Sequence, residues 1–338
     1  MGSIVLLIDP VIVLLVWFLS RLLSHPRNPW QVLDVPNARS LHARPVPRMG
    51  GIAIGIGVLC GSLFLVWQDS LRVLAIVMAL GGIALISWYD DRRGLSARAR
   101  LMAHALAALL VSTVALRWPG FVLPGIYVGV PSFVAAILMA VFLVWATNLY
   151  NFMDGMDGLA GGMAVWGFGT LALLAYRAGD VFYAETGLLV ASAALGFTIS
   201  NFPPARLFMG DVGAATLGFG GGLMMLAGSA RGDFPLWTAL IVFSPFWIDA
   251  TVTLMRRLMR GENPATAHRE HYYQRLVRLG ISQRRVVLGE YVLMGVCAVS
   301  AYGSVGRPVA VQWAIITFLA AFYISLVALV VRWEKAGK

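Results

Sequence analysis

Long apolar runs are the feature that most limits what this chain can fold into. About eleven stretches of the 338 residues are long and apolar enough to cross a bilayer as a helix. Their approximate cores are 4–22, 49–67, 71–89, 101–117, 131–147, 159–176, 184–200, 212–230, 235–255, 286–304 and 311–332. Backbone polar groups must be satisfied internally in lipid, so such runs are expected to be helical. The sequence therefore predicts an all-α integral membrane protein with about eleven transmembrane helices.

Composition and connection lengths indicate a single domain. The chain is 59% hydrophobic and only 12% charged, about half of the roughly 25% charged residues of an ordinary soluble domain. The polar connections are too short to build a soluble domain, so residues 1–338 are expected to form one polytopic membrane domain. The first run contains Asp9 and Pro10 and ends at Arg21 without a small-residue cleavage site, which indicates a retained helix. Cys60 and Cys297 lie within apolar runs and indicate neither a disulfide nor a metal site.

The distribution of basic residues predicts the orientation. With eleven crossings, one side carries the C-terminus and the loops at about 23–48, 90–100, 148–158, 201–211 and 256–285. The other side holds only five of the 26 basic residues: Arg72, Arg117, Arg177, Arg231 and Arg307. The remaining 21 lie on the first side. The positive-inside rule then places the N-terminus outside and the C-terminus in the cytoplasm. The net charge of +10 suits anionic lipid headgroups and anionic substrates, and no nucleic-acid partner is expected.

The unusual polar residues gather at the predicted cytoplasmic side. They are Asp90, Asp91, Asn148, Asn151, Asp154, Asp157, Asp211, Asp249, His268 and His271. Carboxylates at a membrane edge are costly and usually functional. The sequence therefore predicts one active site at the cytoplasmic face.

The stretch NLYNFMDGMDGLAGG (148–162) repeats a polar residue every three positions. On a straight α-helix that spacing rotates by about 60° per step, so the polar side chains converge only if the helix is broken. Gly155 and Gly158 mark where a break is expected. A broken polar turn at membrane depth is tolerated where it lines a wet cavity. The alternative is a solvated loop with Asx-turns.

Asp90, Asp91 and Asp211 each allow two interpretations. Asp90 and Asp91 end the third run, where carboxylates oppose the helix dipole and Arg92 and Arg93 could compensate them. The other interpretation is a metal-binding or proton-transfer role. Asp211 precedes a helix of small residues, so it could be only an N-cap. It could also belong to a magnesium–phosphate site at that helix N-terminus.

The segment 256–285 carries eight arginines, two histidines and two tyrosines. One interpretation is an amphipathic segment lying on the membrane. The other is a cluster that clamps a diphosphate, because arginine donates bidentately to phosphate oxygens.

Several motifs in order resemble one family, the bacterial polyprenyl-phosphate N-acetylhexosamine-1-phosphate transferases. They are PNARSLHARPVPRMGG, DDRRGLSARAR, NLYNFMDGMDGLAGG, FMGDVGAATLG, SPFWIDATVTLMRR and AHREHYYQRL. The resemblance implies transfer of a sugar 1-phosphate from a UDP-activated N-acetylated sugar to undecaprenyl phosphate in the bacterial inner membrane, with release of UMP. It also implies Mg²⁺, with Mn²⁺ as a substitute, and leaves open whether the chain forms a homodimer.

The resemblance also assigns residues. Asp90 and Asp91 match the aspartate pair near the attacking lipid phosphate, and Asn151 and Asp211 match the metal-binding positions. Positions lining the nucleotide site are matched by Asn148, Asp154 and Asp157. The implied chemistry is direct attack by the lipid phosphate with Asp90 or Asp91 as base, or a covalent aspartyl intermediate.

The tail motif departs from many relatives. Where they have His-x-His-His, this chain has His271, Tyr272, Tyr273 and Gln274. The form AHREHYYQRL resembles the O-antigen-initiating branch, which uses 6-deoxy N-acetylated sugars. We therefore expect this stretch to favour such donors, with His268, Arg269 and His271 as substrate-binding residues.

Two other classes remain open. A proton-coupled transporter would also hold carboxylates within a helical bundle, but near the membrane midplane. A phosphatidyltransferase-type enzyme would carry its aspartates in one continuous motif.

The 21-to-5 distribution of basic residues predicts the result of cysteine labelling. Arg92→Cys should react with a membrane-impermeant maleimide only from the cytoplasmic side, and Arg307→Cys only from outside. The measurement is labelling of intact cells against inverted vesicles. Labelling of both positions from outside would exclude the predicted topology.

Overall fold

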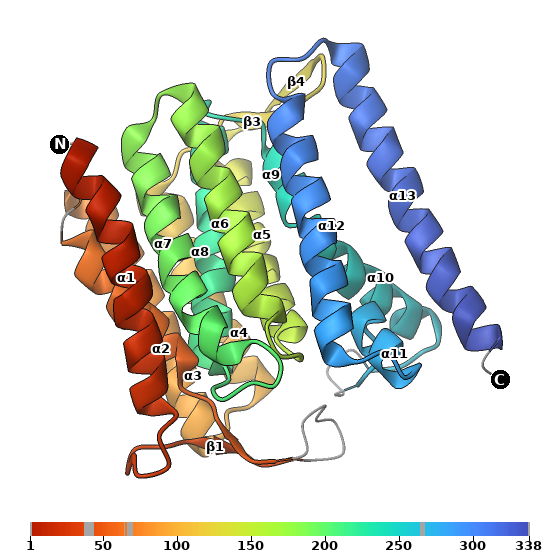
Figure 1. Ribbon diagram of the computed structural model, residues 1–338. Helices are drawn as coiled ribbons and strands as arrows, with labels where there is room; N and C mark the ends of the chain where they lie inside the picture. The colour runs from red at the N-terminus through yellow and green to blue at the C-terminus, as the bar shows by residue number, and fades with distance from the viewer. Residues whose placement is uncertain (1, 37–43, 64, 66–69, 264–267, 337–338) are drawn as a thin grey trace.

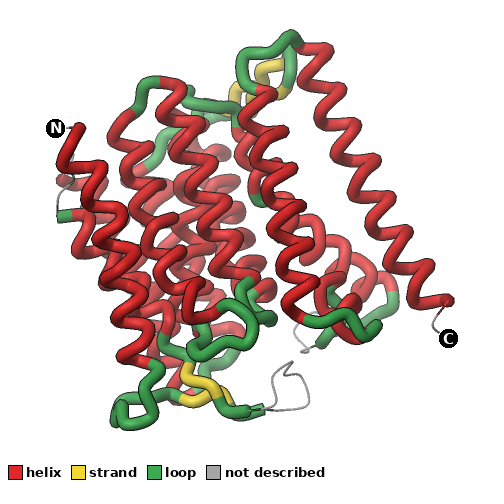
Figure 2. Tube along the Cα trace, in the orientation of Figure 1, coloured by secondary structure: helices red, strands yellow, loops and turns green. Residues whose placement is uncertain are grey.

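The computed structural model describes residues 2–36, 44–63, 65, 70–263 and 268–336, and part of the arginine-bearing loop 23–48 lies outside them. Figure 1 and Figure 2 show a bundle of long helices with short strands at its ends. The helices are α1 (Gly2–Leu23), α2 (Gly50–Ser62), α3 (Ser70–Arg93), α4 (Ala97–Leu110) continuing into the π-helical turn η1 (Val111–Ala115), α5 (Ser132–Met153), α6 (Leu159–Ala178), α7 (Val181–Asn201), α8 (Gly210–Arg231), α9 (Leu236–Val242), α10 (Ser244–Met259), α11 (Tyr272–Arg278), α12 (Gln283–Ser304) and α13 (Val309–Ala336). The strands are β1 (Leu33–Asp34) with β2 (Val46–Pro47), and β3 (Gly120–Leu123) with β4 (Ile126–Gly129), both pairs antiparallel.

The predicted class, an all-α integral membrane protein, is confirmed. Within the described residues, eight helices are long and apolar enough to cross a bilayer, and α9 with α10 makes a ninth crossing if the bent pair counts as one. The first two predicted runs correspond to α1 and to α2, an apolar helix of only 13 residues. The total of eleven crossings stays a prediction. The short strand pairs were not predicted; β1 lies at the lower end of Figure 1 and the β3–β4 hairpin at the upper end.

Two helices extend further than their hydropathy suggests. α5 continues to Met153, so Asn148 and Asn151 lie on a helix and not in the predicted loop 148–158. α3 continues to Arg93 and likewise carries Asp90 and Asp91 on its last turn. The predicted break falls at the glycines, because α6 begins after Gly158, whose φ of 78° suits a residue without Cβ.

The predicted span 235–255 is not one continuous helix. Its two parts, α9 and α10, are bent by 82° at Phe243. Pro245 lies in the first turn of α10, a position where proline favours a helix start. Trp247 Nε1 donates to the carbonyl oxygen of Leu240 at 2.7 Å, which joins the two parts across the bend.

Small residues bring the polar end of α8 against α2. The backbone N–H groups of Gly50 and Gly51 donate to the carbonyl oxygens of Phe208 and Met209, both at 2.8 Å. A Cβ on Gly51 would lie 2.1 Å from the backbone nitrogen of Gly213. Close backbone approach through small residues is the usual way in which membrane helices pack. The start of α8 is therefore fixed by backbone contacts that leave no room for a side chain.

This contact predicts that two glycine-to-alanine substitutions on α2 differ in their effect on stability. Gly51→Ala forces a methyl group into the backbone of α8 and should destabilise the protein by about 1–3 kcal/mol, the usual cost of overpacking. Gly55→Ala, on the same helix, is the control, because a Cβ there meets nothing within 4 Å. The measurement is thermal unfolding of both purified variants in one detergent. An equal melting temperature for Gly51→Ala and the wild type would contradict the close packing of α2 and α8.

Candidate active site

Three carboxylates from separate motifs meet at one end of the bundle. Asp90 and Asp91 lie on the last turn of α3, and Asp211 lies in the first turn of α8. The backbone N–H of Asp211 donates to Asp91 Oδ1 at 3.5 Å, and the Asp211 carboxyl group interacts with the side chain of Asp90. The side chains of Asp90 and Asp91 are buried, whereas that of Asp211 is 29% exposed. Asp211 is thus the carboxylate that a soluble ligand can reach most easily.

Two arginines neutralise this cluster. Arg100 Nη1 lies 2.9 Å from Asp90 Oδ2 and 3.6 Å from Asp211 Oδ2. Arg48 Nη1 lies 3.5 Å from Asp91 Oδ1, and Arg48 Nη2 donates to the Asp91 carbonyl oxygen at 2.5 Å. Arg48 lies after β2 and Arg100 lies on α4. The arginines that pair with the aspartates are therefore not the ones that follow them directly in the sequence.

Compensation of the aspartate pair by Arg92 and Arg93 was one of the two interpretations that the sequence left open. The guanidinium of Arg92 instead lies 4.4 Å from the ring centroid of Trp88, a cation–π contact on the exposed face of α3. The interpretation that Asp90 and Asp91 are compensated by their sequence neighbours is therefore wrong, because Arg48 and Arg100 provide the ion pairs that the structure shows.

The interpretation of Asp211 as an N-cap is also wrong. α8 begins at Gly210, and its N-cap is Met209, which makes no side-chain capping hydrogen bond. The first N–H groups of α8, from Asp211 and Val212, donate to Asp91. A carboxylate at this position is stabilised by the positive end of the helix dipole. Asp91 therefore already uses the donors that were expected to meet a phosphate.

The two asparagines of α5 face different partners. Asn151, on the last turn, interacts with the carboxyl group of Asp211. Asn148 Nδ2 donates to the carbonyl oxygen of Val144 at 2.7 Å, and the Asn148 side chain also interacts with His104 of α4. His104 is buried and was not predicted as a site residue, because one histidine in an apolar helix carries no distinguishing signal.

The donor set fits a magnesium ion that is bound mainly by water and substrate. Among the residues that the structure describes, no group of three or more His, Cys, Asp or Glu side chains is arranged to hold a metal by itself. Mg²⁺ does not need one, since it usually takes one or two carboxylates and completes its shell with water and phosphate oxygens. Asp211 offers a carboxylate in contact with Asp90 and with the Asn151 amide. Two carboxyl groups in contact favour a bound cation or a shared proton.

The turn between α5 and α6 is held in one conformation. Asp157 Oδ2 accepts from the backbone N–H of Ala205 at 2.9 Å, and the N–H of Gly158 donates to Asn201 Oδ1 at 2.8 Å. Burial and then the negative charges of Asp211 and Asp91 raise the pKa of Asp154. These contacts favour the interpretation of a structured turn beside the site over that of a solvated loop.

The predicted substrate-binding histidines lie in a capped helix start. Asp249 of α10 accepts from the backbone N–H of Tyr272 at 3.0 Å, and His271 Nδ1 lies 3.2 Å from Asp249 Oδ1. His271 is buried, and the His268 ring centroid lies 5.0 Å from that of His271. Burial, and then the neighbouring His271, lower the pKa of His268 to about 4, so its imidazole is neutral at pH 7. A role in substrate binding for His268, Arg269 and His271 stays a prediction.

Several arginines of the segment 256–285 are engaged in ion pairs within the protein. Arg257 Nε lies 2.9 Å from Glu262 Oε2, and Arg260 Nε lies 2.8 Å from Glu262 Oε1. Arg275 Nε donates to Glu334 Oε1 of α13 at 2.7 Å. A diphosphate clamp built from these three residues is therefore not what the structure shows.

The tail motif nevertheless touches the candidate site through packing. Tyr273 is completely buried, and a Cβ on Gly155 would lie 2.3 Å from its hydroxyl oxygen. Gln274 is buried beside it, with its Oε1 accepting from the backbone N–H of His271 at 3.3 Å. These two residues therefore support the turn that carries Asp154.

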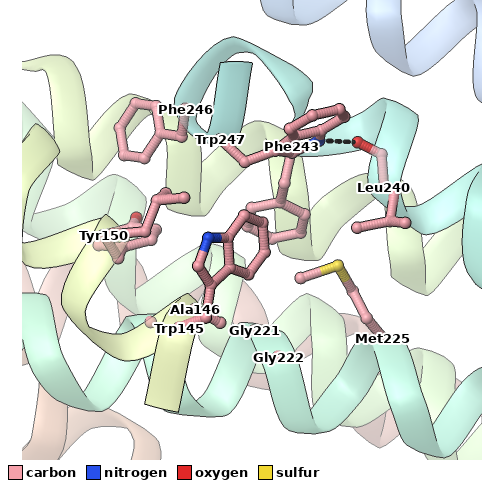
Figure 3. A pocket seen from close by; sticks show the side chains of 12 residues that line it. Trp145, Ala146, Tyr150, Gly221, Gly222, Met225, Leu240, Phe243, Phe246 and Trp247 are labelled. Carbon is pink, nitrogen blue, oxygen red and sulfur yellow. Dashed lines mark hydrogen bonds between the residues drawn. The ribbon is translucent and has the colours of Figure 1, made fainter. Parts of the chain in front are cut away.

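A small apolar, aromatic pocket lies between α5, α8 and the α9–α10 bend. Figure 3 shows side chains of α5, α8 and the α9–α10 bend pointing into it. Its lining includes Trp145, Tyr150, Met225, Phe243, Phe246 and Trp247.

Comparison with known proteins places the chain in a family. The model of glycosyl transferase family 4 matches residues 73–229. The chain is 31% identical over 272 residues to a probable undecaprenyl-phosphate N-acetylglucosaminyl 1-phosphate transferase of Bacillus subtilis, covering 80% of this chain and 76% of that protein. It is 33% identical over 307 residues to a decaprenyl-phosphate N-acetylglucosaminephosphotransferase of Mycolicibacterium smegmatis, covering 80% and 74%. An undecaprenyl-phosphate alpha-N-acetylglucosaminyl 1-phosphate transferase of Yersinia pestis is 25% identical over 90% of this chain and 86% of its own length. The chain belongs to glycosyl transferase family 4.

Proposed function

We propose that this protein transfers an N-acetylated amino-sugar 1-phosphate from a UDP-sugar to undecaprenyl phosphate and releases UMP. The observation that carries the proposal is the meeting of Asp90, Asp91 and Asp211 beside Arg48 and Arg100 at one polar end of a membrane bundle. The relatives named above act on polyprenyl phosphates, which supports the acceptor. The proposed location is the bacterial inner membrane, with this polar end facing the cytoplasm. The proposed reaction is the first membrane step of O-antigen or related glycan synthesis.

The proposed chemistry needs positioning and charge neutralisation more than covalent catalysis. Asp211 and Asn151 would hold Mg²⁺, for which Mn²⁺ would substitute, and the ion would neutralise the diphosphate of the UDP-sugar. Asp211 suits this role because its carboxylate is the most exposed of the three and touches Asn151. Arg100, at 3.6 Å from Asp211, is placed to exchange a carboxylate partner for a phosphate oxygen.

Both aspartates of the pair are held by the protein, and Asp90 is the proposed base only because of its place beside Asp211. The Leu95 N–H donates to Asp90 Oδ1 at 2.5 Å, and Arg100 pairs with Asp90 Oδ2 at 2.9 Å. The Asp91 carboxylate accepts from two backbone N–H groups of α8 and pairs with Arg48. Asp90 interacts with Asp211, so it lies next to the place where the diphosphate would bind. A phosphate monoester has a second pKa of about 6, so most of the acceptor is already a dianion at pH 7, and Asp90 would take a proton only from the monoanion that remains. A covalent intermediate on Asp90 is the second candidate mechanism.

The two competing classes differ from this proposal in product. A proton-coupled transporter forms no UMP, and a phosphatidyltransferase-type enzyme releases CMP or an alcohol from a different donor. Against a transporter, the cluster lies on the last turn of α3 and the first turn of α8 and not at mid-helix.

Removal of the Asp211 charge should abolish turnover while the fold persists. Asp211→Asn keeps the side-chain volume but removes a carboxylate that would stabilise transition-state charge, so UMP release should fall by roughly 10²-fold or more. Asp233→Asn at the opposite end is the control. Burial, and then Asp180, raise the pKa of Asp233 to about 6, so that site already disfavours the charge. The assay contains undecaprenyl phosphate, UDP-N-acetylglucosamine and Mg²⁺; near-normal turnover of Asp211→Asn would exclude a catalytic role for this carboxylate.

The choice of sugar can be measured with three donors. The tail motif predicts higher kcat/KM for UDP-N-acetylfucosamine or UDP-N-acetylquinovosamine than for UDP-N-acetylglucosamine, by no more than ~10²-fold if an apolar pocket discriminates against an added hydroxyl. The burial of Tyr273 and Gln274 means that any such effect acts through the turn at Gly155. If UDP-N-acetylglucosamine is the best donor, the sugar preference is wrong and the reaction class stands.

A further inference from the structure

A second cavity lies between α1 and α7, at the end of the bundle that carries the carboxylate cluster. It measures about 330 Å³ and is formed by the last turns of both helices and the segment that follows α7. The residues used below are Trp17 and Arg21 of α1, Ser200 of α7, and Phe202 and Arg206 after α7. None of them belongs to the candidate active site.

The lining is cationic and suits a phosphate. Arg21 and Arg206 both line the cavity, and the described residues that surround it include no carboxylate. Guanidinium groups bind phosphate oxygens bidentately. Ser200 also lines the cavity, but its Oγ is enclosed by protein, so the two arginines are the groups that can meet a phosphate.

The exposed residues around the cavity are apolar, which favours a lipid as the ligand over a soluble anion. Phe18 and Leu22 of α1 and Ile199 of α7 expose 59%, 56% and 54% of their surface, and Ile199 itself lines the cavity. The Arg21 guanidinium carbon lies 5.5 Å from the centroid of the Trp17 ring. Tryptophan is enriched at the membrane–water interface, where lipid headgroups lie. A ligand that fits must join an anionic headgroup to a hydrocarbon chain. We propose that this cavity binds the phosphate of an anionic glycerophospholipid, with an acyl chain along the exposed face of α1 and α7.

A lipid in this cavity would contact the segment that holds the turn between α5 and α6. The segment 202–206 forms one wall of the cavity, and its Ala205 donates to Asp157 at 2.9 Å. Asn201, at the start of this segment, accepts from Gly158 at 2.8 Å. A headgroup bound to Arg206 therefore stabilises the wall to which the turn between α5 and α6 is tied.

Native mass spectrometry of the delipidated protein in detergent tests the proposal, independently of turnover. Phosphatidylglycerol should bind the wild type at least ~10-fold more tightly than phosphatidylcholine, because basic residues near a membrane favour anionic headgroups. Arg21→Gln with Arg206→Gln should remove that preference. Arg27→Gln with Arg285→Gln is the matched control, since it removes the same charge from exposed positions at the same end and should leave the preference intact.

Two results would overturn the proposal, and one of them distinguishes a lipid phosphate from inorganic phosphate. Undiminished preference for phosphatidylglycerol in the Arg21→Gln, Arg206→Gln variant overturns the proposal, provided that its melting temperature without lipid equals that of the control variant. If it is unfolded, Arg21→Lys with Arg206→Lys replaces it and should weaken binding while keeping the charge, because bidentate contacts are lost. Displacement of bound phosphatidylglycerol by millimolar inorganic phosphate assigns the cavity to a soluble anion and overturns the assignment to a lipid.

Discussion

The contact between Asp91 and the start of α8 is the interaction on which the polar end depends. A carboxylate at the C-terminal end of α3 opposes the dipole of its own helix. The N–H groups of Asp211 and Val212 offset this cost, and Arg48 adds a positive charge at 3.5 Å. Because Arg48 also binds the Asp91 carbonyl oxygen, α3, α8 and the segment after β2 are joined at one point. Asp90 and Asp211 are thereby presented side by side.

Hydropathy and glycine positions predicted the parts of the fold that depend on local sequence. The apolar runs located most of the long helices, and the glycines after Met153 located the break between α5 and α6. The counter-ions of the cluster could not be predicted in this way. Arg48 and Arg100 are two among the many basic residues expected at this end, where the positive-inside rule enriches arginine whatever its role. Only the tertiary packing distinguishes them from Arg92 and Arg93.

The segment after α10 shows that polar residues expected to meet a ligand also make contacts within the fold. His271 and the start of α11 meet Asp249, and Arg257 meets Glu262. Polar groups that are buried need partners, and a buried charge needs a counter-charge. A segment that returns to the bundle therefore uses its own ionic residues to satisfy one another. Sequence alone shows how many arginines are present but not which anion each one meets.

The turn between α5 and α6 is supported from two sides, by the segment after α10 and by the end of α7. Tyr273 packs against Gly155, and the Tyr291 hydroxyl donates to the Gly158 carbonyl oxygen at 2.7 Å. Asn201 and Ala205 hold the same turn from the side of α7. A histidine in place of Tyr273 would be smaller and would bury a more polar ring, leaving space beside Gly155. The departure from His-x-His-His therefore changes the packing that supports the turn between α5 and α6, which carries Asp154 and Asp157.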